Sequence, residues 1–408
     1  MKKILEVKSL NVGYDKRVVV EHVEFEGAKG QMVCLLGPNG AGKSTILRTL
    51  SGLLDPVSGT VKVDGKDINR MKKDELARKM AVVLTEQASP LMTTAFEIAA
   101  MGRYPHTNFL GKLKPEDKEI VKEALETVGA GHLAQRYYSE LSDGEKQKVM
   151  IARALVQQPE VIILDEPTSH LDIKHKVEII HILNRLCRTM NLMVVLALHD
   201  IDLAIKGCQT LLLVKDGKVI TQGAPEDVIK NRTIQELYEI KGARYNEIMG
   251  SVELAGNSTK EIFVVGGNGT GAKVYRSLSR LGYGMASGVL HVNDIDAQVA
   301  RGICSEIITE VPFEKISPFH LKQAKDKLNE ARIVVDTGFF VGEGNRANLE
   351  LLNAAVLAGK KVFSMRTPEE GQKLLGNHSK SVVYCESMSD LTGQLSDKDH
   401  LDHNIKFA

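Results

Sequence analysis

Short, continuously apolar runs recur along the first part of the chain, separated by longer stretches in which apolar residues return at helical spacing. Met32 to Leu36, Val161 to Leu164 and Met193 to Leu198 are runs of this kind. Apolar runs of strand length are typical of parallel strands that helices cover on both faces. The pattern therefore predicts an α/β fold for this part of the chain.

The pattern changes along the chain and predicts where the domains lie. We expect residues 1–245 to form a first domain, with a helical insertion at about residues 93–157, where strand signals vanish. Residues 246–258 are small and polar enough for a linker. A second strand and helix rhythm over residues 259–385 predicts a smaller, doubly wound α/β domain, and residues 386–408 are expected to form a partly ordered tail.

Composition narrows the class of protein. The 408 residues carry 53 basic and 52 acidic side chains, a net charge of +1, which gives no reason to expect a nucleic acid partner. The longest uninterrupted apolar run, Leu192 to Leu198, is far shorter than the roughly 18 residues of a membrane span. The first residues lack the apolar core of a secretory signal, and the cysteines show no C-x-x-C spacing. A reducing cytoplasm fits these features.

A glycine-rich loop after the first apolar run, VCLLGPNGAGKST, matches the phosphate-binding pattern G-x-x-x-x-G-K-[ST]. Its glycines let backbone N–H groups form a nest for phosphate oxygens at the N-terminus of the next helix. Lys43 is placed to reach the β- and γ-phosphates, and the Ser44 hydroxyl to ligate Mg²⁺. A chance glycine-rich turn is the alternative, but the flanking strand and helix argue against it. The residues expected to contact a nucleoside triphosphate are Gly37, Pro38, Asn39, Gly40, Ala41, Gly42, Lys43, Ser44 and Thr45.

Polar residues follow three later strand signals and are candidates for catalysis. Asp165 and Glu166 end an apolar strand, where two adjacent carboxylates are costly unless paired or bound to a metal. Asp165 would hold Mg²⁺, and Glu166 would act as general base toward the attacking water. His199 would contact the γ-phosphate, and the Gln87 amide would reach the metal or the water. The alternative for both is an ordinary polar residue at a strand end.

Two further candidates have plain structural alternatives. Tyr14 follows the first strand and could stack on adenine, although a lone tyrosine there is commonly half exposed for no functional reason. Ser142 and Gly144 lie at a helix N-terminus, which is a geometry suited to anions. The S-x-x-E spacing from Ser142 to Glu145 is also that of a capping box. Both descriptions of this helix start can hold together.

Taken in order, these motifs resemble the nucleotide-binding subunit of ATP-binding cassette (ABC) transporters over roughly residues 1–245. The resemblance implies an ABC ATPase core, which combines a RecA-like P-loop sheet with a helical signature subdomain, and the cofactors ATP and Mg²⁺. One residue departs from the family pattern, because Asp143 replaces the first glycine of Leu-Ser-Gly-Gly. The corresponding elements are Tyr14 for the A-loop, Gly37 to Thr45 for Walker A, Gln87 for the Q-loop, Leu141 to Glu145 for the signature, Val161 to Glu166 for Walker B, Ser169 to Asp172 for the D-loop and His199 for the switch histidine.

The resemblance also implies partners. Walker A of one family member faces the signature of another, so we expect a head-to-tail dimer with a second copy, with Asp172 near the shared ATP. Separate transmembrane permease subunits and, indirectly, a substrate-binding protein would complete a transporter at the cytoplasmic face of the membrane. The stretch FEIAAMGRYPHT and the SHLD of the D-loop look most like importers of iron chelates (siderophores, haem) and cobalamin.

Two other functions compete with import. The first is a soluble, non-transport cassette ATPase, as in iron–sulfur assembly or translation. The translation and repair types usually carry two cassettes or a long coiled-coil insertion, which this sequence lacks. The second is a ligand-sensing regulatory protein whose ATPase is vestigial, against which the intact Glu166 and His199 argue.

The second domain carries a weaker signal. Gly267 to Ala272 fits G-x-G-x-x-[GA], and Asp294 follows the next strand, about where a ribose-binding carboxylate would sit. With a second glycine-rich turn, Gly338 to Asn345, this loop would form a crevice. Gly267, Gly269 and Asp294 are therefore the candidates for binding a small ligand, either a nucleotide or the transported chelate. A domain that only adds dimer contacts is the alternative.

Overall fold

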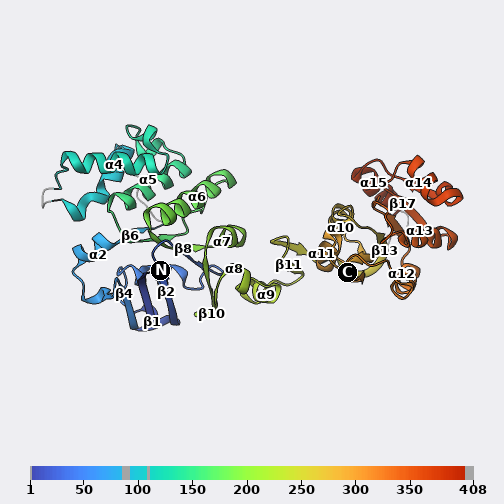
Figure 1. Ribbon diagram of the computed structural model, residues 1–408, viewed down its shortest axis with the longest axis horizontal. Helices are drawn as coiled ribbons and strands as arrows, with labels where there is room; N and C mark the ends of the chain where they lie inside the picture. Colours follow the sequence, from blue (N-terminus) through green and yellow to red (C-terminus); the bar gives the residue numbers. More distant parts are fainter. Residues whose placement is uncertain (1, 85–91, 108–110, 400–408) are drawn as a thin grey trace. The chain divides into compact units, whose positions relative to one another are not determined.

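The structure, a computed structural model, describes residues 2–84, 92–107 and 111–399 (Figure 1). The chain divides into two compact units, Met1–Tyr238 and Glu239–Ala408, which we call the N-terminal unit and the C-terminal unit. No helix in the described ranges combines the length and the apolar character that a bilayer crossing requires.

A sheet of ten strands, in the order β5-β4-β1-β2-β10-β9-β3-β8-β7-β6, lies at the centre of the N-terminal unit. Strands β1, β2, β4 and β5 pair in antiparallel fashion, whereas β9, β3, β8, β7 and β6 pair in parallel. The apolar runs form β3, β7 and β8, which are buried at every position, as expected for parallel strands. The strands are β1 Lys3–Tyr14, β2 Arg17–Ala28, β3 Met32–Leu36, β4 Ser58–Val63, β5 Lys66–Asp67, β6 Met80–Val83, β7 Val161–Asp165, β8 Met193–Leu198, β9 Thr210–Lys215 and β10 Lys218–Gly223.

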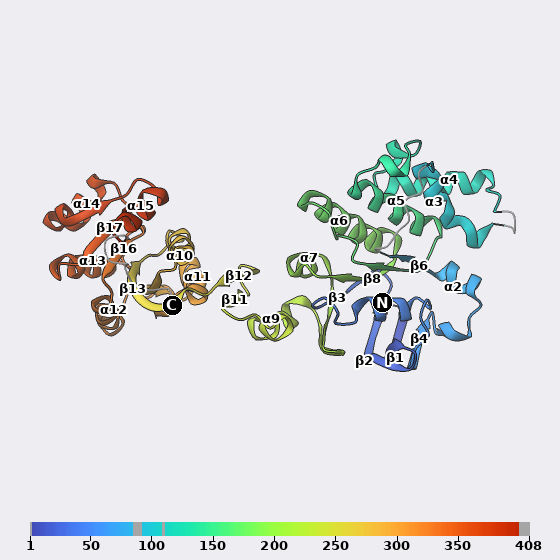
Figure 2. The same ribbon diagram turned by 180° about the vertical axis from the view of Figure 1, so that it is seen from behind.

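Helices flank this sheet, and α3, α4 and α5 form a group of their own in the part of the sequence without strand signals (Figure 2). A buried arginine holds the group together, because Arg103 Nε donates to Asp117 Oδ1 at 2.8 Å and Arg103 Nη1 donates to the Val156 carbonyl at 3.0 Å. The helices of the unit are α1 Lys43–Leu50, α2 Lys73–Lys79, α3 Ala95–Ala100, α4 Pro115–Thr127, α5 Asp143–Val156, α6 Ile173–Met190, α7 Ile201–Gly207, α8 Pro225–Val228 and α9 Asn231–Tyr238.

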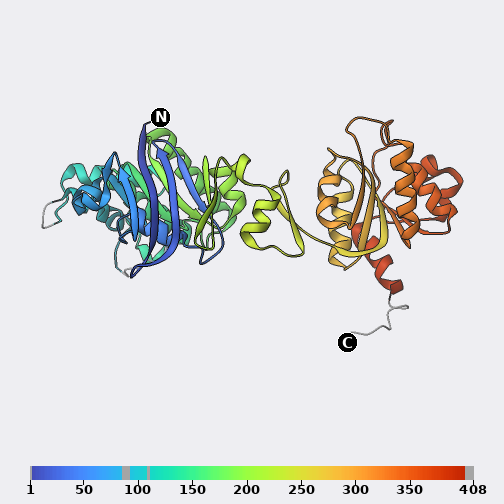
Figure 3. The ribbon, with the colours of Figure 1, turned by 90° about the horizontal axis from the view of Figure 1, so that it is seen from below.

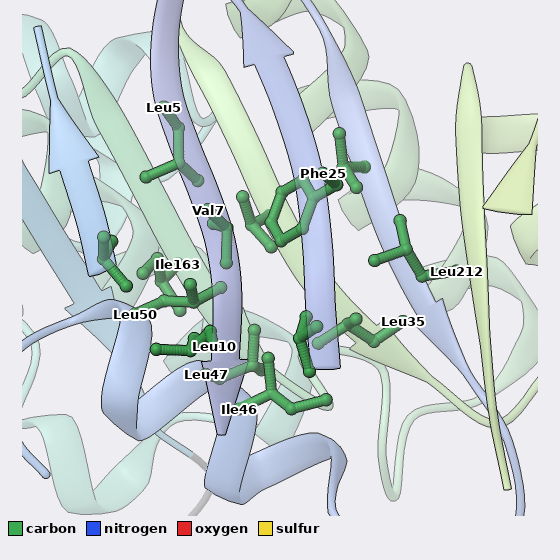
Figure 4. Close-up of a cluster of buried hydrophobic side chains, with 14 of the residues drawn as sticks. Leu5, Val7, Leu10, Phe25, Leu35, Ile46, Leu47, Leu50, Ile163 and Leu212 are labelled. Atoms are coloured by element: carbon green, nitrogen blue, oxygen red, sulfur yellow. The ribbon is translucent and has the colours of Figure 1, made fainter. Parts of the chain in front are cut away.

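A hydrophobic core of the N-terminal unit lies between α1 and the sheet (Figure 4). Leu5 and Val7 lie on β1, and Ile46, Leu47 and Leu50 come from α1. All five are at most 2% exposed. Burial of such side chains stabilises a fold by roughly 1.5–3 kcal/mol each. This packing fixes the position of α1, which begins directly after the glycine-rich loop.

The C-terminal unit contains a parallel sheet of six strands in the order β15-β14-β13-β16-β17-β18. From β13 the chain runs through β14 to β15 at one edge and then returns to β16 on the other side of β13. This reversal is the topological switch point of a doubly wound sheet, so the predicted fold class is confirmed. The strands are β13 Asn257–Val265, β14 Gly284–His291, β15 Glu306–Glu310, β16 Ile333–Asp336, β17 Lys361–Ser364 and β18 Val382–Tyr384.

Helices cover both faces of this sheet (Figure 3). One buried cluster includes side chains from α10, α11 and α15, and a second includes side chains from α12, α13 and α14. The helices are α10 Gly271–Arg280, α11 Ile295–Ile303, α12 Pro318–Glu330, α13 Asn348–Leu357, α14 Pro368–Leu375 and α15 Met388–Asp399.

Two segments differ from the sequence-based expectation. The expected linker, residues 246–258, overlaps a hairpin in which β11 (Ala243–Asn246) pairs with β12 (Ser251–Leu254), and β13 starts at Asn257. Helix α15 lies in the expected tail, where Leu391 and Leu395 are buried. Small or polar residues dominate both segments, and the few buried side chains that order them are too sparse to give a periodic signal.

Candidate functional site

The glycine-rich loop joins β3 to α1 and has the backbone geometry of a phosphate nest. Gly40 and Gly42 have φ angles of +80° and +99°, a conformation that favours glycine. A Cβ on Gly37 would lie 2.1 Å from the Val214 carbonyl oxygen, and one on Gly42 would lie 2.2 Å from Val20 Cγ2. Glycine is thus required at Gly37 and Gly42 because neighbouring strands press against the loop.

Lys43 folds back over this loop. Its Nζ donates to the carbonyl oxygens of Gly37 at 2.8 Å and Pro38 at 3.0 Å. Burial lowers the pKa of Lys43, while the charges of Glu166 and Asp165 act in the opposite direction. The ammonium is therefore held at the loop by carbonyl dipoles, where it is available to an anion.

Ser44 and Asp165 come together from different elements, α1 and β7. The Ser44 hydroxyl donates to Asp165 Oδ1 at 3.0 Å. Burial raises the pKa of Asp165, the hydrogen bond from Ser44 opposes this effect, and the nearby charge of Glu166 adds to it. A hydroxyl and a carboxylate side by side are oxygen donors of the kind that Mg²⁺ accepts, together with waters and phosphate oxygens. These two residues fit the expected metal site.

Glu166 follows Asp165 and has a φ of +48°, which for a side chain other than glycine costs on the order of 1 kcal/mol. Its Oε2 accepts a hydrogen bond from the Ser169 hydroxyl at 2.9 Å and lies 3.7 Å from His199 Nδ1. The structure thus brings Glu166 and His199, two of the predicted catalytic side chains, together. The contact with Ser169 was not anticipated, and the i to i+3 spacing of a tight turn is the signal that could have indicated it.

The signature segment caps α5. The Ser142 hydroxyl accepts from the Glu145 N–H at 3.4 Å, and Glu145 Oε2 accepts from the Ser142 N–H at 2.8 Å. The capping box therefore forms, and it engages Ser142 with Glu145 rather than with the phosphate loop. Gly144 is buried, and a Cβ there would lie 2.4 Å from the ring of His175. Asp143 points outward, with 69% of its side chain exposed.

Asp172 and Tyr14 lie at the start of α6 and at the end of β1. Asp172 caps α6 by accepting from the His175 N–H at 2.8 Å. Tyr14 ends β1, is paired with Arg17 and is 45% exposed. Gln87 lies outside the described residues, so its expected contact with the metal or water stays a prediction.

In the C-terminal unit, the first glycine loop is already engaged by the chain's own carboxylates. The N–H groups of Gly267 and Gly271 donate to Asp296 Oδ2 at 2.9 and 2.8 Å. Asp294 accepts from the N–H of Asn268 at 2.6 Å and caps α11. Sequence reasoning missed Asp296, whose only signal is an acidic residue in the first turn of a helix.

Comparison with known proteins gives likenesses over both units. The family described as ABC transporter matches residues 20–169, and the MJ0874 family matches residues 285–392. An uncharacterised ABC transporter ATP-binding protein of Methanocaldococcus jannaschii is 46% identical over 289 residues, which cover 70% of this chain and 100% of that protein.

Two relatives have names that state a transported compound. The iron(3+)-hydroxamate import ATP-binding protein of Bacillus subtilis is 36% identical over 236 residues, which cover 58% of this chain and 88% of that protein. The cobalamin import ATP-binding protein of Halobacterium salinarum is 32% identical over 320 residues, which cover 76% of this chain and 80% of that protein.

Proposed function

Because this chain belongs to the ATP-binding proteins of the ABC transporter family, which hydrolyse ATP with Mg²⁺, we propose that it powers the import of an iron chelate (a siderophore or haem) or of cobalamin. The observation that carries the proposal is the match to two import ATP-binding proteins across 88% and 80% of their lengths. No observation favours a non-transport ATPase or a sensor with a vestigial ATPase.

The hydrolytic roles follow from the geometry of the nucleotide site. Lys43 would exchange the carbonyls of Gly37 and Pro38 for the β- and γ-phosphate oxygens, which match its charge better. Ser44 and Asp165 would hold Mg²⁺, which neutralises developing phosphate charge when it is bound.

The residues expected to activate water are Glu166, which follows β7, and His199, which follows β8. Glu166 would accept the proton of the attacking water, because its carboxylate is oriented by Ser169 and its charge acts on Lys43 of the phosphate loop. His199 lies beside it and would contact the γ-phosphate. Loss of the γ-phosphate would remove the group that both His199 and Lys43 hold.

A second copy of the chain would complete each site. Ser142 caps α5 through its hydrogen bonds with Glu145, and both residues lie far from the glycine-rich loop in sequence. We propose that Ser142, Gly144 and Asp172 face the ATP that a second copy holds. In that arrangement the exposed Asp143 carboxylate would have to point away from the γ-phosphate.

A groove in the helical part of the N-terminal unit suits a permease subunit. The groove has a volume of about 490 Å³ and is lined by apolar side chains that include Phe96, Met101 and Leu113. Met101 is 54% exposed and Tyr104 is 74% exposed. We propose that a segment of a transmembrane permease docks in this groove at the cytoplasmic face of the membrane, with a substrate-binding protein acting indirectly through that permease.

Uptake by cells that lack this gene tests the proposal. We expect loss of uptake of radiolabelled ferric siderophore, haem or cobalamin, and recovery with the wild-type gene. Lys43→Ala should fail to restore uptake because ATP binding is lost, and Tyr104→Glu because the charge disrupts docking. Lys122→Glu, an exposed change on α4, serves as the control and should restore uptake. Unchanged uptake of all three compounds in the deletion strain would contradict the proposal.

A further inference from the structure

The glycine loop between β13 and α10 is an anion nest that the protein fills with its own carboxylate. Asp296 Oδ2 accepts from the N–H groups of Gly267 and Gly271, and Oδ1 accepts from the N–H of Ala272 at 2.9 Å. The Asp296 side chain is fully buried. In a dinucleotide-binding fold these N–H groups, at the start of the helix, would face the pyrophosphate.

A phosphate at this loop would have to displace Asp296 or lie against its negative charge. Displacing Asp296 is unfavourable because its buried carboxylate would lose three backbone donors that nothing else in the described structure replaces. Binding beside it is unfavourable because two negative charges would repel each other. Asp294 is committed as well, since it accepts from Asn268 and from the N–H of Asp296 at 2.9 Å. The G-x-G-x-x-[GA] loop therefore serves to hold the carboxylates of the protein itself. Gly267 and Gly269 are poor candidates for contacting a nucleotide.

A cavity of about 320 Å³ lies beside the filled nest, between the glycine-rich turns that follow β13 and β16 and next to the end of β14. His291, Asp294 and Phe340 contribute to its wall, and no lysine or arginine does so among the described residues. Phe340 is 75% exposed, although it is a large aromatic side chain. The Asn345 amide bonds to the Phe340 carbonyl at 2.8 Å and thereby fixes the turn that carries the ring.

We propose that this cavity binds a small, flat organic cation without a phosphate group. The positive charge would meet the Asp294 carboxylate, whose oxygens retain acceptor capacity beyond the two backbone bonds. The flat face would pack on the Phe340 ring, which favours cations through its π electrons. Asp296 then acts as the residue that excludes nucleotides. This site goes beyond the ATPase function and does not depend on it.

Three ligands of similar size and different charge test the cation site in the full-length protein. Benzamidinium, benzamide and benzoate share a flat ring and differ in charge, and their binding is measured by ligand-observed NMR at millimolar concentration. We expect benzamidinium to bind most tightly and benzoate least. Asp294→Asn keeps one oxygen to cap α11, loses the acceptor for the Asn268 N–H and removes the charge. It should weaken benzamidinium binding about threefold or more, as should Phe340→Ala. Asp326→Asn, an exposed aspartate on α12, is the control.

Asp296→Ala tests the exclusion of phosphate. All proteins in this experiment carry Lys43→Ala, so that phosphate binding at the loop between β3 and α1 does not contribute to the measured signal. We expect calorimetry to detect no pyrophosphate or NAD⁺ binding with Asp296 present, and pyrophosphate binding once the nest is empty. If Asp296→Ala does not fold, pyrophosphate added during refolding should rescue it. Pyrophosphate binding with Asp296 present, preference for benzoate, or no binding of benzamidinium would each overturn the proposal.

Discussion

Glu166 lies between the Ser169 hydroxyl and the His199 ring, in a backbone conformation that glycine would adopt more readily. Such strain persists only where the surrounding structure enforces it, which is common at functional sites. The side chain is held by the Ser169 hydroxyl in the turn that follows β7. A change that keeps its shape should therefore isolate its chemistry.

Glu166→Gln tests that chemistry. We expect hydrolysis to fall by about 10²- to 10⁴-fold, because an amide cannot take the proton of the attacking water. ATP binding should persist, since Lys43 and Ser44 are untouched. Phosphate release and retention of labelled ATP measure the two properties. Glu123→Gln, an exposed glutamate on α4, should leave both unchanged. Near-normal turnover by Glu166→Gln would remove this residue from the mechanism.

A buried carboxylate in the C-terminal unit joins β15 to the start of α12. Glu310 ends β15 and is buried, and its Oε2 lies 2.8 Å from His320 Nδ1 and accepts from the Ser317 N–H at 2.9 Å. Burial alone would raise the pKa of Glu310. The hydrogen bonds from His320, Ser317 and Val311 outweigh burial and lower the pKa to about 2.

This pKa predicts a dependence of stability on pH. The folded state holds the Glu310 proton less tightly than the unfolded state, so the stabilisation is complete above the ordinary pKa of about 4.3 and is lost as the pH falls toward about 2. Glu310→Gln should lower the free energy of opening the contact between β15 and α12 at pH 7 by on the order of 2 kcal/mol. It should also reduce the further loss of stability of this contact at low pH. Hydrogen exchange of β15 and α12 at pH 7 and pH 3 measures this. Exchange identical to that of the exposed control Glu314→Gln would contradict the prediction.

Local motifs were predictable from the sequence, whereas contacts between distant segments were not. The glycine-rich loop and the Asp165 and Glu166 pair each lie in one short stretch beside an apolar strand, so their positions follow from the sequence pattern. Asp296 fills a loop that precedes it by a whole strand and helix, and nothing in the spacing reveals that contact. The pairing of β11 with β12 escaped notice because few side chains of that hairpin are buried.

For the protein as a whole, the proposed dimer makes each ATP site depend on two chains. We expect Lys43→Ala and Ser142→Arg proteins to be inactive alone and to recover activity when mixed. Each mixed dimer would combine one intact Walker A with one intact signature, giving roughly a quarter of wild-type ATPase activity if subunits assort at random. The measurement is steady-state phosphate release after mixing.

The control replaces one parent with a protein that carries both changes. Mixing Lys43→Ala with the double variant Lys43→Ala and Ser142→Arg leaves no intact Walker A, so activity should stay absent. Circular dichroism of each parent checks that Ser142→Arg, which also removes the cap of α5, is folded. A mixture as inactive as its parents would count against shared sites.

The contact between Gly37 and Val214 has a consequence for biosynthesis. The phosphate nest closes against β9, a strand that the ribosome delivers only after β7 and β8. Until β9 emerges, β3 has an unpaired edge, and the nascent chain exposes apolar strands that depend on distant partners. We therefore expect nucleotide to bind only after β9 has emerged, when most of the N-terminal unit has been translated. The C-terminal unit emerges afterwards, and none of its described strands belongs to that sheet.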